Sequence, residues 1–349
     1  MRFGLIGAGC IGQLRARALR KVEGASLVAV ADVESTRAAM LARPAGAMTA
    51  ASAADLLGVD SIDAVIVSTP PPFHEEAAVA SLRAGKHVLC EKPLSNSVEA
   101  CRRMVDAAGD NGKMLATGFN HRFFPAVQFL KKTVAAGVIG KLNHVRAFAG
   151  HEGLTQFRAA WEYEKNVIGG GALMDVGIHI IDLTAHILGD VREVFGIATG
   201  SVFNLTGSED NGFGLLRSSN GAVATLHASW TEWKGYRFYI EAYGDRGMVR
   251  AFYAPMMNML ITKEAAESTP RRRFKFYPAI TMKEKLFGWQ DTVVETFRQE
   301  ISEFMALCGG GRAEQIADGR AGLRAVEIAN AIYRSSAEGQ PITLSSGGD

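Results

Sequence analysis

A glycine-rich turn near the amino terminus constrains the fold of this chain more strongly than any other feature. Residues 7–12 read GAGCIG; they follow an apolar run at 3–6 and precede a segment of helical character at 13–22. A second apolar run begins at Leu27 and is followed by Asp32, which lies 20 positions beyond the last glycine. A strand, a G-x-G-x-x-G turn, a helix and a second strand ending in an acid form the βαβ unit that binds dinucleotides. The sequence therefore predicts such a unit at its start.

Each glycine of this turn has its own steric task. Gly7 permits the tight turn, Gly9 lets the backbone approach a pyrophosphate, and Gly12 allows the helix to pack closely on the strand. The helix then presents unpaired N–H groups and a partial positive charge to the phosphates. We therefore expect five residues of the turn to contact the cofactor: Gly7, Gly9, Cys10, Ile11 and Gly12. The alternative is a glycine turn that binds nothing.

Asp32 indicates which dinucleotide this unit prefers. Its carboxylate is expected to accept hydrogen bonds from the adenosine ribose hydroxyls, which favours NAD because the 2′-phosphate of NADP would meet a negative charge. Arg37 is close enough in sequence to offset that phosphate, so the use of NADP stays open.

Strands and helices continue to alternate up to residue 119. Apolar runs at 63–69, 87–90 and 114–118 predict strands, and helical patterns fall at 75–84 and 98–108. This alternation predicts an α/β domain with a doubly wound parallel sheet over residues 1–119. The proline-rich turn at 69–74 provides three candidate cofactor contacts: Thr69, Pro70 and His74. We expect His74 to form hydrogen bonds at a helix start rather than to act as a catalyst.

The pattern changes over residues 120–349, which we interpret as a second α/β domain for substrate binding. Helices are expected at about 125–136, 172–188, 292–307 and 319–335. Strands are expected at 142–149, 193–199, 212–216, 222–230, 236–243 and 247–252. Several of these strands alternate apolar and polar residues, which is typical of a sheet with one face on helices. The irregular stretch 254–285 is expected to be a mobile loop or an oligomer contact.

Lys92 is the first candidate catalytic residue. It stands in the tripeptide Glu91-Lys92-Pro93, directly after the predicted strand at 87–90. Ligands of doubly wound sheets bind at the carboxyl ends of the strands, so the amine is expected near the cofactor. The alternative is an exposed surface lysine.

The predicted helix at 172–188 carries the second set of candidates. Asp175, His179, Asp182 and His186 follow the spacing i, i+4, i+7 and i+11, which aligns them along one face. A solvent-facing stripe and a metal site formed by the first three are alternatives, but no other cluster of ligand residues supports a metal. We favour acid–base catalysis in which His179 exchanges the proton and Asp175 orients the substrate or tunes the histidine. Asp182 would support the site and His186 would be structural.

These motifs, in this order and spacing, resemble the glucose–fructose oxidoreductase / inositol dehydrogenase / MocA family over nearly the whole chain. The resemblance rests on residues 7–12, on AGKHVLCEKP at 84–93, and on residues 169–182. It implies a Rossmann domain followed by a mostly antiparallel open sheet that is often used for oligomerisation. It also implies NAD(P)-dependent oxidation of a hydroxyl on a sugar or cyclitol, with Lys92, Asp175 and His179 as the catalytic triplet.

The resemblance makes the chemistry and the remaining candidates concrete. His179 would take the proton of a secondary alcohol as hydride passes to the nicotinamide, while Lys92 would stabilise the charge that develops on the oxygen. Glu91 and Asn120 join the expected cofactor contacts. The candidate substrate contacts are Lys92, Arg122, His151, Trp161, Asp175 and His179. Arg122 could hold a carboxylate. The basic run Arg271, Arg272 and Arg273 could hold a phosphate or form a solvated loop.

Two other functions stay open. A non-catalytic NAD(P)-sensing regulator would bind the cofactor without turnover, although the presence of all three catalytic candidates argues against it. NAD-dependent glycoside cleavage would use the same fingerprint, so the motifs discriminate poorly. No motif determines which sugar or cyclitol is used, because the lining of the pocket comes from loops.

Composition limits the partners and the compartment. With 38 basic and 36 acidic residues the formal net charge is +2, which provides no global field for nucleic acid or an anionic membrane. The four cysteines have neither metal-site spacing nor a disulfide pattern, which indicates the reducing cytoplasm. The predicted strand at residue 2 or 3 leaves no room for a signal peptide, and no run approaches the roughly 18 apolar residues of a membrane span. We expect a small-molecule substrate and a homodimer or homotetramer.

Overall fold

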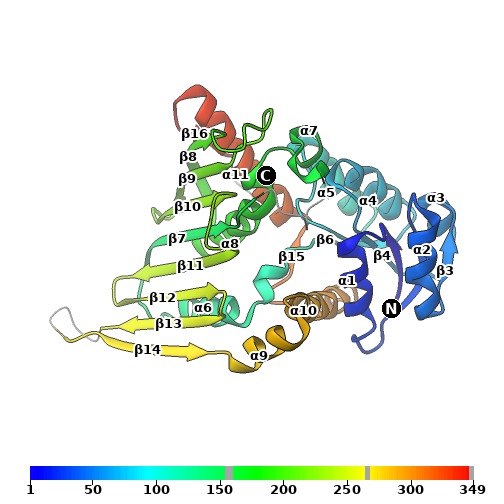
Figure 1. The fold of residues 1–349 in the computed structure, drawn as a ribbon, viewed down its shortest axis with the longest axis horizontal. Helices are drawn as coiled ribbons and strands as arrows, with labels where there is room; N and C mark the ends of the chain where they lie inside the picture. The colour runs from blue at the N-terminus through cyan, green and yellow to red at the C-terminus, as the bar shows by residue number, and fades with distance from the viewer. Residues whose placement is uncertain (154–159, 264–267, 346–349) are drawn as a thin grey trace. The chain divides into compact units, whose positions relative to one another are not determined.

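The computed structural model describes residues 1–153, 160–263 and 268–345, which form two compact units (Figure 1). The first unit comprises Met1–Phe123 and Lys283–Leu323, and the second comprises Phe124–Met282 and Arg324–Asp349. The expected division at residues 119 and 120 therefore differs from the structure, in which residues 283–323 return to the first unit.

The first unit contains a seven-stranded sheet in the order β15-β6-β5-β4-β1-β2-β3. Its parallel strands are β1 (Arg2–Ile6), β2 (Ser26–Ala31), β3 (Met48–Ala50), β4 (Ala64–Val67), β5 (His87–Cys90) and β6 (Leu115–Thr117). The short β15 (Ala317–Asp318) pairs antiparallel with β6. The five predicted strands are confirmed, whereas β3 and β15 are too short to give a periodic pattern.

Helices follow these strands as the alternation predicts. They are α1 (Cys10–Leu19), α2 (Ser35–Ala42), α3 (Ala53–Leu57), α4 (His74–Arg83) and α5 (Val98–Asp110), with 3₁₀ turns η1 (Arg43–Ala45), η2 (Pro71–Phe73) and η3 (Asn120–Phe123). The returning helix α10 (Gln290–Cys308) packs on α1. Its Phe304 ring lies 6.3 Å from the ring of Phe3 in β1. Burial of the apolar stripe of α10 in this core explains why the segment belongs to the first unit.

The second unit contains a nine-stranded sheet in the order β14-β13-β12-β11-β7-β10-β9-β8-β16. The strands are β7 (Leu142–Gly150), β8 (Val191–Thr199), β9 (Asn211–Ser218), β10 (Val223–Ser229), β11 (Arg237–Gly244), β12 (Gly247–Tyr253), β13 (Met257–Thr262), β14 (Arg271–Phe276) and β16 (Ile342–Thr343). Only the β7–β10 pair is parallel among the pairings of the described strands. The mostly antiparallel sheet is therefore confirmed.

For the stretch 254–285 the sequence predicts a mobile loop or an oligomer contact. In place of a loop, the structure builds β13, β14 and the helix α9 (Pro278–Phe287) there, while the oligomer contact stays a prediction. The periodicity of the sequence does not predict β14 or α9, because neither element buries any of its residues. Neither therefore has an apolar face that packs on a core.

The helices of the second unit are α6 (Pro125–Ala135), α7 (Lys165–Ile168) and α8 (Ile178–Leu188), with a 3₁₀ turn η4 (Ala160–Tyr163) and a π-helical turn η5 (Leu173–Gly177). The long helix α11 (Gly319–Glu338) begins in the first unit and ends in the second. The segment Lys165–Leu188 is long and apolar enough to cross a membrane, contrary to our expectation that no segment is. However, 89% of its most apolar window is buried inside the protein, as in the core helix of a globular fold. The protein itself therefore covers this apolar surface.

Candidate cofactor and catalytic sites

The glycine turn between β1 and α1 has the steric properties that a dinucleotide requires. Gly7 has φ +97°, and a Cβ there would lie 2.6 Å from the Ser68 backbone. A Cβ at Gly12 would lie 2.1 Å from the carbonyl oxygen of Gly7, so both positions need glycine. At Gly9 a Cβ would meet no described atom within 4 Å, which leaves open space above the turn.

The amino terminus of α1 fits an anion in that space. Within the described part of the chain, α1 has no side-chain cap and no acidic residue in its first turn. Its first N–H groups therefore lack the side-chain acceptor that usually caps a helix. Cys10 and Ile11, the expected contacts in this turn, are both exposed. These residues fit the pyrophosphate of a dinucleotide.

Asp32 lies at the end of β2, and the backbone fixes its carboxylate. Its Oδ2 accepts a hydrogen bond from the Ala8 N–H at 2.6 Å, and its Oδ1 accepts one from the Glu34 N–H at 2.8 Å. Each carboxylate oxygen has a second lone pair with which to accept a ribose hydroxyl. Arg37 forms an exposed ion pair with Glu34, with 2.8 Å between Nη2 and Oε1.

His74, an expected cofactor contact, connects two turns of the first unit. It is completely buried, and its Nε2 lies 2.7 Å from the carbonyl oxygen of Thr69 while Nδ1 lies 3.0 Å from that of Pro93. Burial lowers the pKa of His74. The ring therefore bridges the proline-rich turn and the turn that carries Lys92, in agreement with the expected hydrogen-bonding role at a helix start. Thr69 and Pro70, the other expected contacts in this turn, are half-buried.

The Glu91-Lys92-Pro93 turn follows β5, and Lys92 is half-buried. The carboxylate of Glu91, an expected cofactor contact, forms an ion pair with Arg15 of α1, at 2.5 Å between Nε and Oε1. His121 lies near Lys92. Burial, together with the charge of Lys92, lowers the pKa of His121 to about 3, so its ring is neutral at physiological pH. Sequence reasoning did not select Arg15 or His121.

Asn120 and Arg122 contact other segments of the first unit. Asn120 donates from Nδ2 to Oγ1 of Thr296 at 3.0 Å. Arg122 is buried and donates from Nη1 to the carbonyl oxygens of Gln315 and Ile316 at 3.3 and 3.4 Å. Both side chains therefore bind the returning segment. The expected contact of Arg122 with a substrate carboxylate stays a prediction.

Asp175 is the centre of a buried hydrogen-bonded cluster in the second unit. Its Oδ2 accepts a bond from Nε1 of Trp230 and lies near Nε2 of His151, both at 3.0 Å. The Gly153 N–H donates to Nδ1 of His151 at 2.9 Å. Because Nδ1 accepts that bond, the proton of a neutral His151 sits on Nε2 and points at Asp175. His151 is therefore placed beside a catalytic candidate.

The helix that carries Asp175 and His179 is not a regular α-helix. Residues Leu173–Gly177 form a π-helical turn, and the α-helix begins at Ile178. Asp175, His179 and Asp182 are all buried, which excludes the solvent-facing stripe; His186 is half-buried. A π turn changes the angular position, around the helix axis, of the residues before it. Such turns are frequent at functional sites. Among the described residues, no group of three or more histidines, cysteines, aspartates and glutamates could hold a metal ion.

The triple glycine at 169–171 is explained by close packing. A Cβ at Gly170 would lie 1.9 Å from the Tyr333 hydroxyl, and one at Gly171 would lie 2.1 Å from the carbonyl oxygen of Glu209. The Glu209 carboxylate accepts bonds from the Leu173 N–H at 2.8 Å and the Tyr333 hydroxyl at 2.9 Å. Burial raises the pKa of Glu209. Glu209 thus anchors the start of the π-helical turn, a role that no local motif indicated.

Trp161, a candidate substrate contact, and Tyr163 are half-buried in η4. The Tyr163 ring lies edge-on against Trp230, with 5.2 Å between the ring centroids. Tyr163 therefore supports the tryptophan that binds Asp175.

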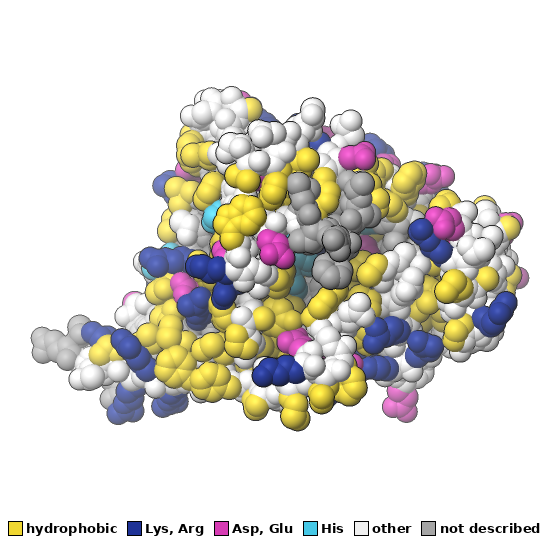
Figure 2. Space-filling model, viewed as in Figure 1, with side chains coloured by type: hydrophobic (Ala, Val, Ile, Leu, Met, Phe, Trp, Pro, Cys, Tyr) yellow, Lys and Arg dark blue, Asp and Glu magenta, His cyan; other side chains and the backbone are white. Residues whose placement is uncertain are grey.

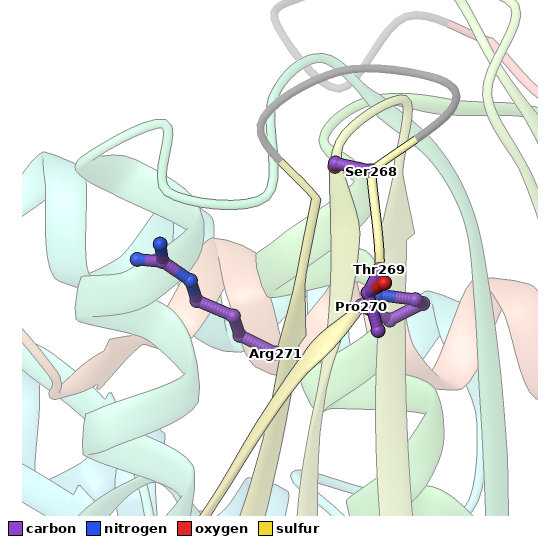
Figure 3. A pocket seen from close by; sticks show the side chains of 4 residues that line it. All are labelled: Ser268, Thr269, Pro270 and Arg271. Carbon is purple, nitrogen blue, oxygen red and sulfur yellow. The ribbon is translucent and has the colours of Figure 1, made fainter.

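The arginine run lies in β14, an exposed strand rather than a loop. A surface cavity of about 310 Å³ lies at its start, lined by Ser268, Thr269, Pro270 and Arg271. Figure 3 shows the Arg271 side chain pointing away from the other three. None of these residues belongs to the cofactor or catalytic candidates above.

Known proteins resemble this chain over both of its parts. Residues 1–119 match the oxidoreductase family with an NAD-binding Rossmann fold, and residues 127–250 match the GFO/IDH/MocA C-terminal domain. The chain is 31% identical over 283 residues to myo-inositol 2-dehydrogenase of Thermotoga maritima, a match that covers 79% of this chain and 82% of that protein.

Two solved structures share the fold. A levoglucosan dehydrogenase in complex with NADH and L-sorbose has a TM-score of 0.87 and 24% identity, covering 99% of both chains. The WlbA dehydrogenase of Bordetella pertussis, in complex with NADH and UDP-GlcNAcA, has a TM-score of 0.81 and 26% identity, covering 99% of this chain and 98% of that one. The predicted fold class, a Rossmann domain with a mostly antiparallel second sheet, is confirmed.

Proposed function

Because the chain belongs to the GFO/IDH/MocA family of oxidoreductases with an NAD-binding Rossmann domain, we propose that it oxidises a secondary hydroxyl of a sugar, sugar derivative or cyclitol by hydride transfer to NAD(P)⁺. One observation carries the proposal: the buried Asp175 carboxylate is held by Trp230 and His151, four residues before a buried histidine in the same helical segment. That arrangement combines an acceptor, a proton carrier and exclusion of water.

Each proposed catalytic residue has a separate role. His179 takes the proton of the substrate hydroxyl as general base. Lys92 donates a hydrogen bond to the same oxygen and stabilises the negative charge that develops there. Asp175 orients the substrate or tunes the histidine. The bound nicotinamide supplies the hydride acceptor.

For the cofactor we propose NAD in preference to NADP. The open space at Gly9 and the uncapped amino terminus of α1 support the pyrophosphate position. The backbone-fixed Asp32 carboxylate supports recognition of ribose hydroxyls, and the Glu34 carboxylate offsets the charge of Arg37. In steady-state kinetics we expect kcat/KM to be higher with NAD⁺, and the preference to fall in Asp32→Ser. A preference for NADP⁺ in the unaltered protein would overturn the assignment.

For the substrate class we propose a polyol or a cyclic sugar. The related proteins act on or bind different molecules of this kind: their names specify myo-inositol and levoglucosan, and one complex contains UDP-GlcNAcA. The test follows NADH absorbance across inositols, aldoses, anhydro sugars, sugar acids and nucleotide sugars, with His179→Ala as the control. Cofactor binding without turnover on the whole panel would indicate a regulator. Release of an aglycone without net NADH would indicate glycoside cleavage.

We also propose that the chain self-associates. Large apolar side chains are exposed along residues 271–289, namely Phe274, Phe276, Met282, Leu286, Phe287 and Trp289. On the face shown in Figure 2, hydrophobic and basic side chains gather over β14 and α9. An apolar surface of this kind is unusual on a monomer. We expect light scattering after size-exclusion chromatography to give a dimer or tetramer that Phe274→Ser/Phe276→Ser weakens, while Met40→Ser on exposed α2 does not; an unaltered monomer would contradict this.

The proposed compartment is the reducing cytoplasm. All four cysteines are free thiols, and two of them, Cys90 and Cys101, are buried. Free thiols that persist in a folded protein are typical of reducing compartments.

A further inference from the structure

Arg15 is the largest completely buried charged side chain described in the first unit, and it belongs to none of the motifs above. It lies on α1, three residues after the last glycine of the cofactor turn, and is completely buried. Its Nε donates to Oε1 of Glu91 at 2.5 Å, and its Nη1 donates to Oε2 of Glu300 on α10. One guanidinium therefore joins the helix of the cofactor turn to the turn that carries Lys92.

The surroundings of Arg15 are built for a planar guanidinium. Its Cζ lies 3.7 Å from the centre of the Phe297 ring, which is the geometry of a cation–π contact. On another side, a Cβ at Gly118 would lie 2.5 Å from Nη2 of Arg15 and 3.1 Å from Oε2 of Glu91. A lysine could supply the charge but neither the fork nor the flat face.

Glu91 connects Arg15 to Lys92. Its Oε2 accepts a hydrogen bond from the Lys92 backbone N–H at 3.3 Å, while Oε1 is held by Arg15. The next residue of the same turn, Pro93, is held through its carbonyl oxygen by His74. Lys92 thus stands between two anchored residues, and the Arg15 anchor comes from the helix at which the cofactor site begins.

We propose that Arg15 is a positioning residue: through Glu91 it sets the orientation of Lys92 and couples that lysine to the helix that binds the cofactor phosphates. The inference rests on the proposed function, in which Lys92 stabilises the reacting oxygen. It goes beyond that function by giving a positioning role to a completely buried residue that lies 77 positions from Lys92 in the sequence.

A purely structural ion pair makes a different prediction. Removing one partner of a buried pair would then lower stability, because a charge is left without compensation. Activity of the protein that remains folded would be normal. The experiment must therefore separate the orientation of Lys92 from stability.

Kinetics of folded variants provide the first test. We expect Arg15→Met to lower kcat by about 100-fold, the effect of a small misplacement of a catalytic group, with little change in the Kd for NAD⁺. Arg15→Lys should restore part of the loss. In a Lys92→Met background Arg15→Met should have almost no further effect, because the residue it positions is absent. Arg20→Met, which removes an exposed charge from the carboxyl end of α1, is the matched control. Additive effects of the two substitutions would overturn the proposal.

The second test needs neither turnover nor cofactor. Lysine-selective acetylation of the apo protein, read at peptide level by mass spectrometry, reports the accessibility of Lys92. We expect Arg15→Met to increase labelling of Lys92 several-fold while exposed Lys141 is unchanged. Glu300→Gln, which keeps the size of the side chain, is expected to give a smaller increase in the labelling of Lys92. This variant replaces Arg15→Met in the test if Arg15→Met does not fold. Unchanged labelling of Lys92 would refute the positioning role. Altered labelling in a protein that oxidises no substrate would instead refute the proposed function alone.

Discussion

The two units hold their catalytic candidates by different kinds of interaction. In the first unit, Lys92 follows a glutamate that is held by charge: Arg15 faces both Glu91 and Glu300 in a fully buried position. In the second unit, Oδ2 of Asp175 accepts a hydrogen bond from the indole N–H of Trp230 and meets Nε2 of His151. The indole carries no charge, whereas the cluster around Arg15 is formed by charged side chains and is packed in a buried position. The comparison therefore predicts that the ion cluster of the first unit makes stability depend on pH, through the raised pKa of Glu300.

The largest effect should come from removing the proton acceptor of the second unit. We expect His179→Ala to lower kcat/KM by about 10²- to 10⁴-fold, the range for general acid–base residues. Lys92→Met in the first unit should cost about 10²- to 10³-fold, as for loss of one donor to a developing oxyanion. Steady-state NADH formation measures both. Full turnover in either variant would remove that residue from the mechanism.

A smaller effect should follow when a neutral donor of the second unit is removed. Trp230→Phe keeps a ring against Tyr163 but deletes the N–H that reaches Asp175. Because a hydrogen bond to a charged group contributes about 1.5–3 kcal/mol, we expect an approximately tenfold or greater fall in kcat. Trp233→Phe is the control, since Trp233 is 66% exposed. Equal kinetics for the two variants would show that the bond to Asp175 is not used.

The pH dependence of stability should report on the ion cluster of the first unit. Burial and the nearby Glu91 raise the pKa of Glu300 to about 7, against the lowering effects of Arg15 and Arg122. Because the folded-state pKa lies above the unfolded value, this contribution is fully present below about pH 4.5 and is lost as the pH rises through about 7. Relative to Glu300→Gln, the unaltered protein should lose on the order of 2 kcal/mol of unfolding free energy between pH 5 and 8.

Urea unfolding of both proteins at several pH values measures this difference. A pH-independent difference would mean that Glu300 stays ionised in the folded protein.

The cofactor turn was predictable because its requirements are local. The glycines, the flanking strand and helix, and Asp32 all lie within 30 residues, and backbone sterics determine the need for Gly7 and Gly12. Lys92, Asp175 and His179 were selected for the same reason, by short motifs on predicted elements. The sequence also indicates His151 as a substrate contact, and the structure places it beside Asp175, another candidate substrate contact.

Residues outside any motif were missed where a distant partner defines them. Glu300 meets Arg15 across 285 positions of sequence, and Tyr333 meets Glu209 across 124. A buried arginine in a helix looks like a surface residue until its partners are known. The π turn at Leu173–Gly177 was also missed, because an α-helical count of the polar residues fits almost equally well.

By itself, the sequence determined the two classes of sheet, the dinucleotide turn and the candidate catalytic side chains, because periodicity and steric demands act over a few residues. Tertiary structure decided the return of residues 283–323 to the first unit, the ion cluster behind Lys92 and the donors that hold Asp175. These depend on burial of surfaces and charges that are brought together from distant segments, and burial is a property of the packed chain rather than of any single segment.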